Sequence, residues 1–240
     1  KKRETGVFLS VLGFGTGNLK DAKMEQLADQ GNGNYYYIDN LFEAQKVLVT
    51  EMGGTLNTIA KDVKIQVEFN PTKVYQYRLI GYENRALKNE DFENDAKDAG
   101  ELGAGHSVTA IYEIVLKDKA VETATEVKYK YQTTQASPDA YANNELGIIN
   151  LRYKEPDSDK SKLVEHKILN NQVSFDQTSN DFKFAAAVVE YGLILRASTY
   201  KNNASLNQVI KLAKLSKGED QQGYREAFIK MVETTKAIYK

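Results

Sequence analysis

The stretch VFLSVLGF at residues 7–14 is an almost continuous apolar run, and the glycine-rich segment GFGTG at residues 13–17 ends it. A run of this kind is typical of a parallel strand that helices cover on both faces. Apolar residues at helical spacing begin after Asp21, and Gly31 is placed to end that helix in the left-handed conformation. We therefore expect a strand, a tight turn and a helix.

A second strand and a second helix follow at once. Residues 34–38 read NYYYI, and Asn40 is placed to cap a helix that continues through Met52. Gly53 and Gly54 are expected to close that helix. The order strand, helix, strand, helix indicates the second half of a doubly wound α/β domain.

The pattern changes after residue 60. Residues 61–69 alternate, so that apolar side chains such as Ile65 share one face while polar side chains such as Lys64 share a face that we expect to be wet. Further segments with strand character follow at residues 74–82, 107–116, 125–131, 146–154 and 162–169. They predict an antiparallel sheet or sandwich.

The end of the chain returns to helical spacing. Apolar stripes predict three helices, over residues 182–195, from a cap at Ser205 to Gly218, and over residues 224–238. We therefore predict an α+β protein in three parts. They are the second half of a doubly wound α/β domain, an antiparallel β-sandwich and a three-helix unit, at residues 1–54, 55–170 and 171–240.

The composition argues against several classes of function. With 32 Lys and Arg against 33 Asp and Glu, the net charge is −1, which gives no overall basic field for nucleic acid. The chain has no Cys, so disulfides, thiolate metal sites and Cys nucleophiles are excluded. The most apolar stretch, residues 184–195, contains Glu190 and is shorter than the roughly 20 residues of a membrane-spanning helix. We expect neither nucleic-acid binding nor a membrane span.

Several motifs resemble a bacterial family of proteins that carry a von Willebrand factor type A domain. The run at residues 6–18 and the segments directly after it resemble the C-terminal half of that domain. Later motifs resemble the family's C-terminal region of unknown function. The motifs read EMGGTL at 51–56, RLIGYENR at 78–85, DAGE at 98–101, GAGH at 103–106, LRYK at 151–154, DFKFA at 181–185 and KGED at 217–220.

The metal site that this resemblance implies falls outside the chain. A-type domains hold Mg²⁺ with an Asp-x-Ser-x-Ser loop and with Thr and Asp from two later loops, and they leave one coordination position for a carboxylate of a partner. These loops are expected upstream of Lys1, so no residue here inherits a ligand role, and we expect a piece of a longer protein. The resemblance implies a non-enzymatic module that binds another protein, in the bacterial periplasm or cell envelope.

The resemblance also implies that one helix changes position when a ligand binds. The helix predicted over residues 41–52 is the last of the A-type fold, and in that family it is the one that shifts on ligand binding. Gly53 and Gly54 would then form a hinge between this helix and the β-sandwich. The strand at residues 7–14 is expected to lack neighbours on one side, and homo-oligomers could form through that exposed sheet edge.

Two acidic segments are weak candidates for a cation site. Asp157 and Asp159 stand at alternate positions of the segment DSDKS, but the surrounding pattern is that of a polar hairpin turn. The acidic loop, residues 90–101, includes Asp95 and Asp98 and lacks the ordered spacing of a calcium loop. We expect a turn and a solvated loop. The carboxylates of that loop could instead meet the basic helical region at the C-terminus.

The sequence also contains candidate sites for functions other than protein binding. GFGTG lies where backbone amides cradle phosphate, but it lacks the further residues of a dinucleotide or P-loop motif, so a tight turn is favoured. His106 and His166 lie in or beside predicted strands, and Ser107 would point away from His106, so structural roles are expected. The alternatives are a hydrolase that uses carboxylates of the acidic loop and a carbohydrate-binding module that stacks sugars on tyrosines such as those at 35–37.

Overall fold

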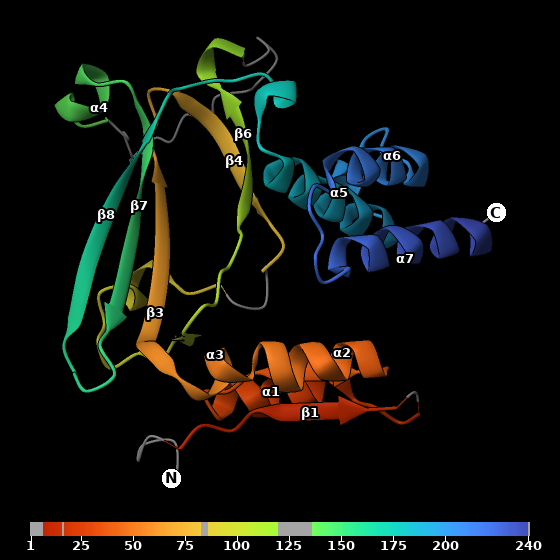
Figure 1. Cartoon of the computed structure of the whole chain (residues 1–240). Coiled ribbons are helices and arrows are strands. Elements are labelled where there is room, and N and C mark those ends of the chain that lie inside the picture. The colour runs from red at the N-terminus through yellow and green to blue at the C-terminus, as the bar shows by residue number, and fades with distance from the viewer. Residues whose placement is uncertain (1–6, 16, 83–85, 120–135, 240) are drawn as a thin grey trace. The chain divides into compact units, whose positions relative to one another are not determined.

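The computed structural model describes residues 7–15, 17–82, 86–119 and 136–239 (Figure 1). The chain divides into two compact units, residues 1–170 and residues 171–240. Every described strand lies in the first unit, and the second is helical. This mixed architecture confirms the predicted α+β class, whereas the further division at residue 54 stays a prediction. Among the described residues, no helix is long and apolar enough to cross a membrane.

The first unit begins with a small parallel layer. Strand β1 (Val11–Phe14) pairs with strand β2 (Tyr35–Ile38), and helix α1 (Asp21–Gln30) connects them. The predicted parallel crossover is therefore confirmed. Strand β1 is shorter than the apolar run that predicts it, because β2 offers only a short partner.

Two glycines allow close contact within this layer. A Cβ added at Gly13 would lie 2.7 Å from Cδ2 of Leu19, and a Cβ added at Gly31 would lie 2.6 Å from Cβ of Leu9. The predicted left-handed helix end at Gly31 is wrong, because Gly31 has φ −95° and Asn32 takes the left-handed conformation at φ +53°. Asn tolerates this conformation better than most residues. Glycine is instead required at position 31 because a side chain there would be too close to Leu9.

The second helix of the layer is broken. Helix α2 (Leu41–Gln45) begins at Asn40, whose side chain accepts a hydrogen bond from the amide of Glu43 as predicted. It continues as a π-helical turn, η2 (Lys46–Thr50), and helix α3 (Met52–Leu56) follows. A π-helical turn interrupts the ordinary hydrogen-bond ladder, so the predicted single helix becomes three short pieces.

Gly53 and Gly54 lie inside α3, so the helix end predicted there is wrong. A Cβ added at Gly54 would lie 2.8 Å from the carbonyl oxygen of Ala104, whereas Gly53 has open space around it. Gly54 therefore lets α3 approach the turn that follows strand β5 (Gly100–Gly103). The proposed hinge at these two glycines stays a prediction.

A four-stranded antiparallel sheet dominates the first unit (Figure 1). Its order is β5, β3 (Thr58–Phe69), β7 (Glu145–Lys154) and β8 (Ser161–Leu169). Strand β3 lies between β5 and β7, and Ile65 is opposite Leu151. The antiparallel arrangement of the middle region is as predicted.

A second antiparallel sheet contains only β4 (Val74–Ile80) and β6 (Ile111–Leu116). The ring of Phe69 in β3 lies 4.5 Å from that of Tyr77 in β4 and 5.4 Å from that of Tyr112 in β6, measured between centroids. These aromatic contacts join the two sheets. The strand predicted at residues 125–131 lies outside the described residues.

The centre of β3 turns a different face inward from the one predicted. Lys64, expected on the wet face, is 2% exposed, and Ile65, expected on the apolar face, is 59% exposed. The register between β3 and β7 shifts between Lys61 and Lys64, and Asp62 within this bulge has φ +50°. Because successive residues of a strand alternate sides, the bulge turns Lys64 inward and Ile65 outward.

Short helical turns connect the larger elements. The first unit contains η4 (Asn89–Asp91), η5 (Lys117–Lys119) and α4 (Pro138–Ala142). The second contains η6 (Phe175–Gln177) and η7 (Thr199–Lys201).

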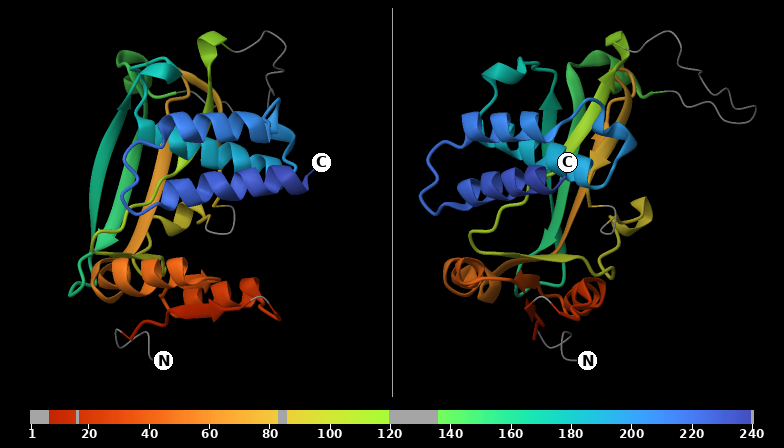
Figure 2. Two further views of the ribbon diagram at one scale, coloured as in Figure 1. Left: turned by 45° about the vertical axis from the view of Figure 1, so that its right-hand side comes forward. Right: turned by 90° about the vertical axis from the view of Figure 1, so that its right-hand side faces the viewer.

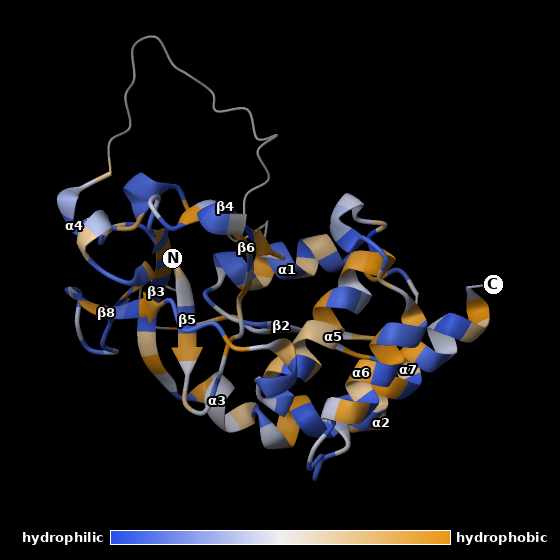
Figure 3. Ribbon diagram, turned by 90° about the horizontal axis from the view of Figure 1, so that it is seen from above, coloured by the Kyte–Doolittle hydropathy of each residue, from blue (hydrophilic) through white to orange (hydrophobic). Residues whose placement is uncertain are grey.

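The second unit consists mainly of the three predicted helices, which lie side by side in both views of Figure 2. They are α5 (Asn180–Leu195), α6 (Leu206–Ser216) and α7 (Tyr224–Ile238). Ser205 caps α6 as predicted, by accepting a hydrogen bond from the amide of Gln208. The helices carry hydrophobic and hydrophilic stripes (Figure 3), and their apolar stripes bury one cluster, made of Ala187, Tyr191, Val209, Ala213, Ile229 and Val232.

Candidate functional site

The outer edge of β1 is open. The amide of Val11 donates a hydrogen bond to the carbonyl of Asn34, on the side of β2, at 2.8 Å. Because successive amides of a strand point to opposite sides, those of Ser10 and Leu12 point away from β2. In the part of the chain that the structure describes, β1 pairs with β2 alone. The edge therefore presents backbone donors and acceptors to a further strand.

An apolar hollow of about 540 Å³ lies beside β1. One wall comes from the face of the parallel layer, and the other comes from η2 and α3. The large side chains that line it are Phe8, Leu12, Tyr36, Leu48, Met52 and Leu56. The open edge and the hollow thus lie next to each other, and we refer to them together as the β1 surface.

Apolar side chains around the parallel layer are unusually exposed. Leu41 is 88% exposed, Leu56 is 77% exposed, and Val49 and Phe14 are also exposed. A two-stranded sheet buries too little surface to be stable without further packing. Large exposed apolar patches mark interaction surfaces in soluble proteins, and of these side chains Leu56 lines the hollow. These features favour the β1 surface as a surface on which a further protein segment packs.

The tyrosines of β2 have structural partners. The hydroxyl of Tyr35 donates to Asp21 in α1, and this bond raises the pKa of Tyr35 to about 12. Tyr36, on the opposite face, shares a 2.9 Å hydrogen bond with Thr55 in α3, and Tyr37 donates to a backbone carbonyl at 2.8 Å. Tyr35 and Tyr36 therefore tie β2 to the helices on its two faces, and Tyr37 ties it to the glycine-rich turn at Gly15.

Two tyrosines of the second sheet pack at an angle to the ring of Phe69 in β3. Tyr77 is 56% exposed, but its ring makes an angle of 42° with that of Phe69. Tyr112 makes an angle of 68° with Phe69. The carbohydrate-binding alternative requires coplanar exposed tyrosine rings. These two angles describe packing against Phe69, so that alternative stays a prediction.

Two lysines hold the acidic loop against the four-stranded sheet. Nζ of Lys64 donates to a carbonyl of the loop, and Nζ of Lys154 donates to the carbonyl of Asp95 and to the carboxylate of Asp62, both at 2.7 Å. Burial lowers the pKa of Lys64, whereas the hydrogen bond and charge of Asp62 outweigh burial and raise the pKa of Lys154. The loop is largely exposed, as predicted, but its backbone is anchored within the first unit.

The weak metal candidates of the acidic loop have separate partners. Asp95 accepts a hydrogen bond from the amide of Ser161 at 3.4 Å, and hydrogen bonding with Ser161 lowers the pKa of Asp95. Asp98 accepts a hydrogen bond from Nδ2 of Asn32 at 3.0 Å. Each carboxylate thus has its own hydrogen-bond partner within the first unit.

The other candidates, Asp157 and Asp159, are exposed in the turn between β7 and β8. The amide of Ser158 donates to the carbonyl of Glu155 at 3.0 Å, as expected for the predicted hairpin turn. Over all the residues that the structure describes, no three His, Asp or Glu side chains gather as a cation site.

Glu101 lies where the parallel layer meets the four-stranded sheet. Nδ2 of Asn32, in the turn between α1 and β2, donates to Oε1 of Glu101 at 3.3 Å. Burial and then the charge of Asp62 raise the pKa of Glu101 to about 7. Oε2 of Glu101 and Oδ1 of Asn32 are buried without a hydrogen-bond partner among the described residues. This pair was not predictable from the sequence, because 69 positions separate its members and no local signal connects them.

The described histidines do not assemble a hydrolase site. His106 is exposed in the turn after β5, and His166 is exposed in β8. Neither of the two hollows described, beside β1 and between α6 and α7, is lined by a histidine or by a carboxylate of the acidic loop. Gly15 has φ +85°, which agrees with a tight turn at the glycine-rich segment.

Comparison with known proteins finds a matching family model and a curated relative, both of which carry the description "uncharacterized". Residues 54–238 match the family model described as "Uncharacterized protein YfbK, C-terminal". The chain is 44% identical over 238 residues to "Uncharacterized protein YfbK" of Escherichia coli (strain K12). The match covers 99% of this chain and 40% of that relative, so the chain spans well under half the length of the relative.

Two solved structures are also similar. The ArnB paralog VWA2 from Sulfolobus acidocaldarius matches with a TM-score of 0.39 and 14% identity, over 96% of this chain and 55% of that one. The von Willebrand factor type A protein from Catenulispora acidiphila matches with a TM-score of 0.41 and 15% identity, over 95% and 52%. The family match over residues 54–238 is the one that assigns the chain: it belongs to the YfbK C-terminal family.

Proposed function

We propose that this chain is a non-enzymatic scaffolding module, whose β1 surface packs against the remainder of an A-type domain in a longer protein. The observation that carries the proposal is the open edge of β1 beside an apolar hollow of about 540 Å³. A further parallel strand on this edge would pair with the outward amides of Ser10 and Leu12. Its own helix would then cover the apolar side chains that are exposed around the layer.

The proposed role is protein binding rather than catalysis. The lysines of β3 and β7 anchor the acidic loop, and Asp95 and Asp98 accept hydrogen bonds from Ser161 and Asn32. An enzyme that used these carboxylates would need them free and grouped in a pocket. We place any Mg²⁺ contact with a partner protein on residues beyond this chain, and we place the full-length protein in the periplasm or cell envelope.

The test is association of the two parts of a full-length family member. This chain and the remaining part of the full-length protein are produced separately, mixed, and examined by size-exclusion chromatography with light scattering, with and without Mg²⁺. We expect a one-to-one complex. Leu12→Pro, which removes an outward amide, and Phe14→Lys, which puts a charge on the open edge, should abolish the complex.

Leu163→Lys is the matched control, because Leu163 is 46% exposed on β8, the strand at the end of the four-stranded sheet. It should leave the complex intact. Failure of the two parts to associate would overturn the proposal, as would association that Leu12→Pro and Phe14→Lys leave unchanged. A complex of two copies of this chain alone, lost in the same variants, would instead assign the edge to homo-oligomers.

A further inference from the structure

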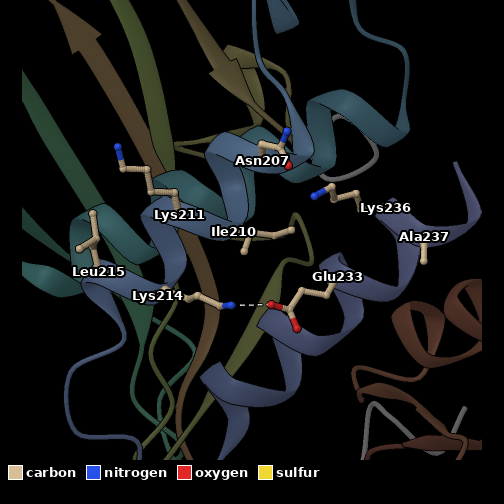
Figure 4. A pocket seen from close by; sticks show the side chains of 8 residues that line it. All are labelled: Asn207, Ile210, Lys211, Lys214, Leu215, Glu233, Lys236 and Ala237. Atoms are coloured by element: carbon tan, nitrogen blue, oxygen red, sulfur yellow. Dashed lines mark ion pairs between the residues drawn. The ribbon is translucent and has the colours of Figure 1, made fainter. Parts of the chain in front are cut away.

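A groove of about 670 Å³ lies between α6 and α7 in the second unit (Figure 4). Ile210 lies between the two helices, and Nζ of Lys214 forms an ion pair with Oε1 of Glu233 across the groove at 2.6 Å. The side chains that matter for its chemistry are Ile210, Lys211, Lys214, Leu215, Glu233 and Lys236. The groove thus lies between two helices that also contribute to the buried cluster of the second unit.

The groove combines apolar and cationic groups. Leu215 is 73% exposed, although Ala213, two positions before it in α6, is fully buried. Glu233 neutralises Lys214, but the described residues show no ion pair for Lys211 or Lys236. Three lysines therefore stand against one carboxylate, which leaves a positive rim beside an exposed aliphatic surface.

The shape favours a peptide over a lipid surface. A helix that lies on a membrane buries a continuous apolar face between headgroups and acyl chains. Here the aliphatic groups belong to a hollow, and lysines stand on both of its sides. A hollow receives protruding side chains, as in complexes where an amphipathic helix lies in a groove. The positive rim selects acidic residues beside those anchors.

We propose that the groove between α6 and α7 binds an acidic amphipathic segment of a partner protein. Aliphatic or aromatic anchors on one face of the segment contact Ile210 and Leu215, and carboxylates flanking them pair with Lys211 and Lys236. This site lies in the second unit, and it does not depend on the function proposed for the β1 surface.

The experiment uses a fluorescein-labelled peptide with Leu on one helical face and Glu on the other, titrated with the full chain. Fluorescence anisotropy should show saturable binding that weakens as salt is added. Lys236→Glu and Leu215→Asp should each weaken binding by about tenfold. Both side chains are exposed, so circular dichroism should show a folded chain in each variant.

Lys230→Glu is the matched control, because Lys230 is exposed on the same helix but does not line the groove. It should bind the peptide as the unchanged chain does. Equal weakening by Lys230→Glu and Lys236→Glu would reduce the effect to general charge attraction and overturn the proposal. Absence of peptide binding would also overturn it, and so would sedimentation with phosphatidylglycerol vesicles that Leu215→Asp abolishes while the peptide stays unbound.

Discussion

The parallel layer and the three-helix unit differ in how completely they bury their large apolar side chains. In the helical unit, Val209, Ala213 and Val232 are completely buried. Among the described residues of the layer, Ala28, Ile38 and Val47 are buried, whereas Leu41 and Leu56 remain mostly exposed. Helices satisfy their backbone hydrogen bonds internally, so three of them can close a core by packing stripes together. A sheet of two short parallel strands buries less apolar surface, even with helices on both of its faces, and it leaves the outer edge of β1 unpaired among the described residues.

The largest effect should come from the closed core. Ile229 is 1% exposed within the cluster of the helical unit, so Ile229→Ala should lower the free energy of unfolding by about 2–5 kcal/mol. Ile238→Ala on the same helix and Leu41→Ala in the layer, at 74% and 88% exposed, should each cost less than about 0.5 kcal/mol. Chemical denaturation followed by circular dichroism measures all three. A loss for Leu41→Ala as large as that for Ile229→Ala would remove the contrast between the regions.

A smaller effect should appear where the layer joins the sheet. The pKa of Glu101 is about 7 in the folded chain, against an ordinary value of 4.5, so the folded state binds this proton more tightly. The stabilisation is fully present below about pH 4.5 and is lost as the pH rises through 7. Because the side chain is partly exposed, we expect a loss of about 1–2 kcal/mol rather than the full value of the shift.

Glu101→Gln supplies the control for this pH dependence. The neutral amide keeps the size of the side chain and removes its titration, so the variant should be more stable than the unchanged chain at pH 8 and similar to it at pH 4.5. Urea denaturation across this pH range measures the difference. A variant with the same pH profile as the unchanged chain would show that Glu101 does not titrate in this window.

Features set by near neighbours were predictable from the sequence, and features set by distant contacts were not. The caps at Asn40 and Ser205 depend on an amide three positions away, and both were predicted correctly. The burial of Lys64 depends on a bulge at Asp62, which alternation of residue types does not reveal. The parallel layer is an intermediate case. The order of its strands follows from local sequence patterns, whereas the packing over its exposed apolar side chains depends on distant parts of the protein.

The candidate sites also depend on contacts between residues that are distant in the sequence. No motif connects Asn32 with Glu101, because their contact depends on how the layer meets the sheet. The groove of the helical unit has no motif either, since it needs the packing of α6 against α7 to bring Leu215 and Lys236 to one surface. Sequence patterns identify the stripe that each helix buries, but which exposed side chains then gather depends on the angle and register of packing.

The smallest effect should come from the two helix caps, and it tests whether the layer and the helical unit unfold with the same cooperativity. Asn40→Ala and Ser205→Ala each remove one side-chain acceptor, at a cost of about 1 kcal/mol. In the helical unit α6 shares a closed core, so the loss at Ser205 should appear as lower stability of all three helices in hydrogen exchange. At Asn40 the short helix α2 has little buried surface, so exchange should rise locally, at Glu43 and its neighbours, while β3 and β7 stay protected. Uniform loss of protection across the first unit in Asn40→Ala would show that the layer is as cooperatively packed as the helices.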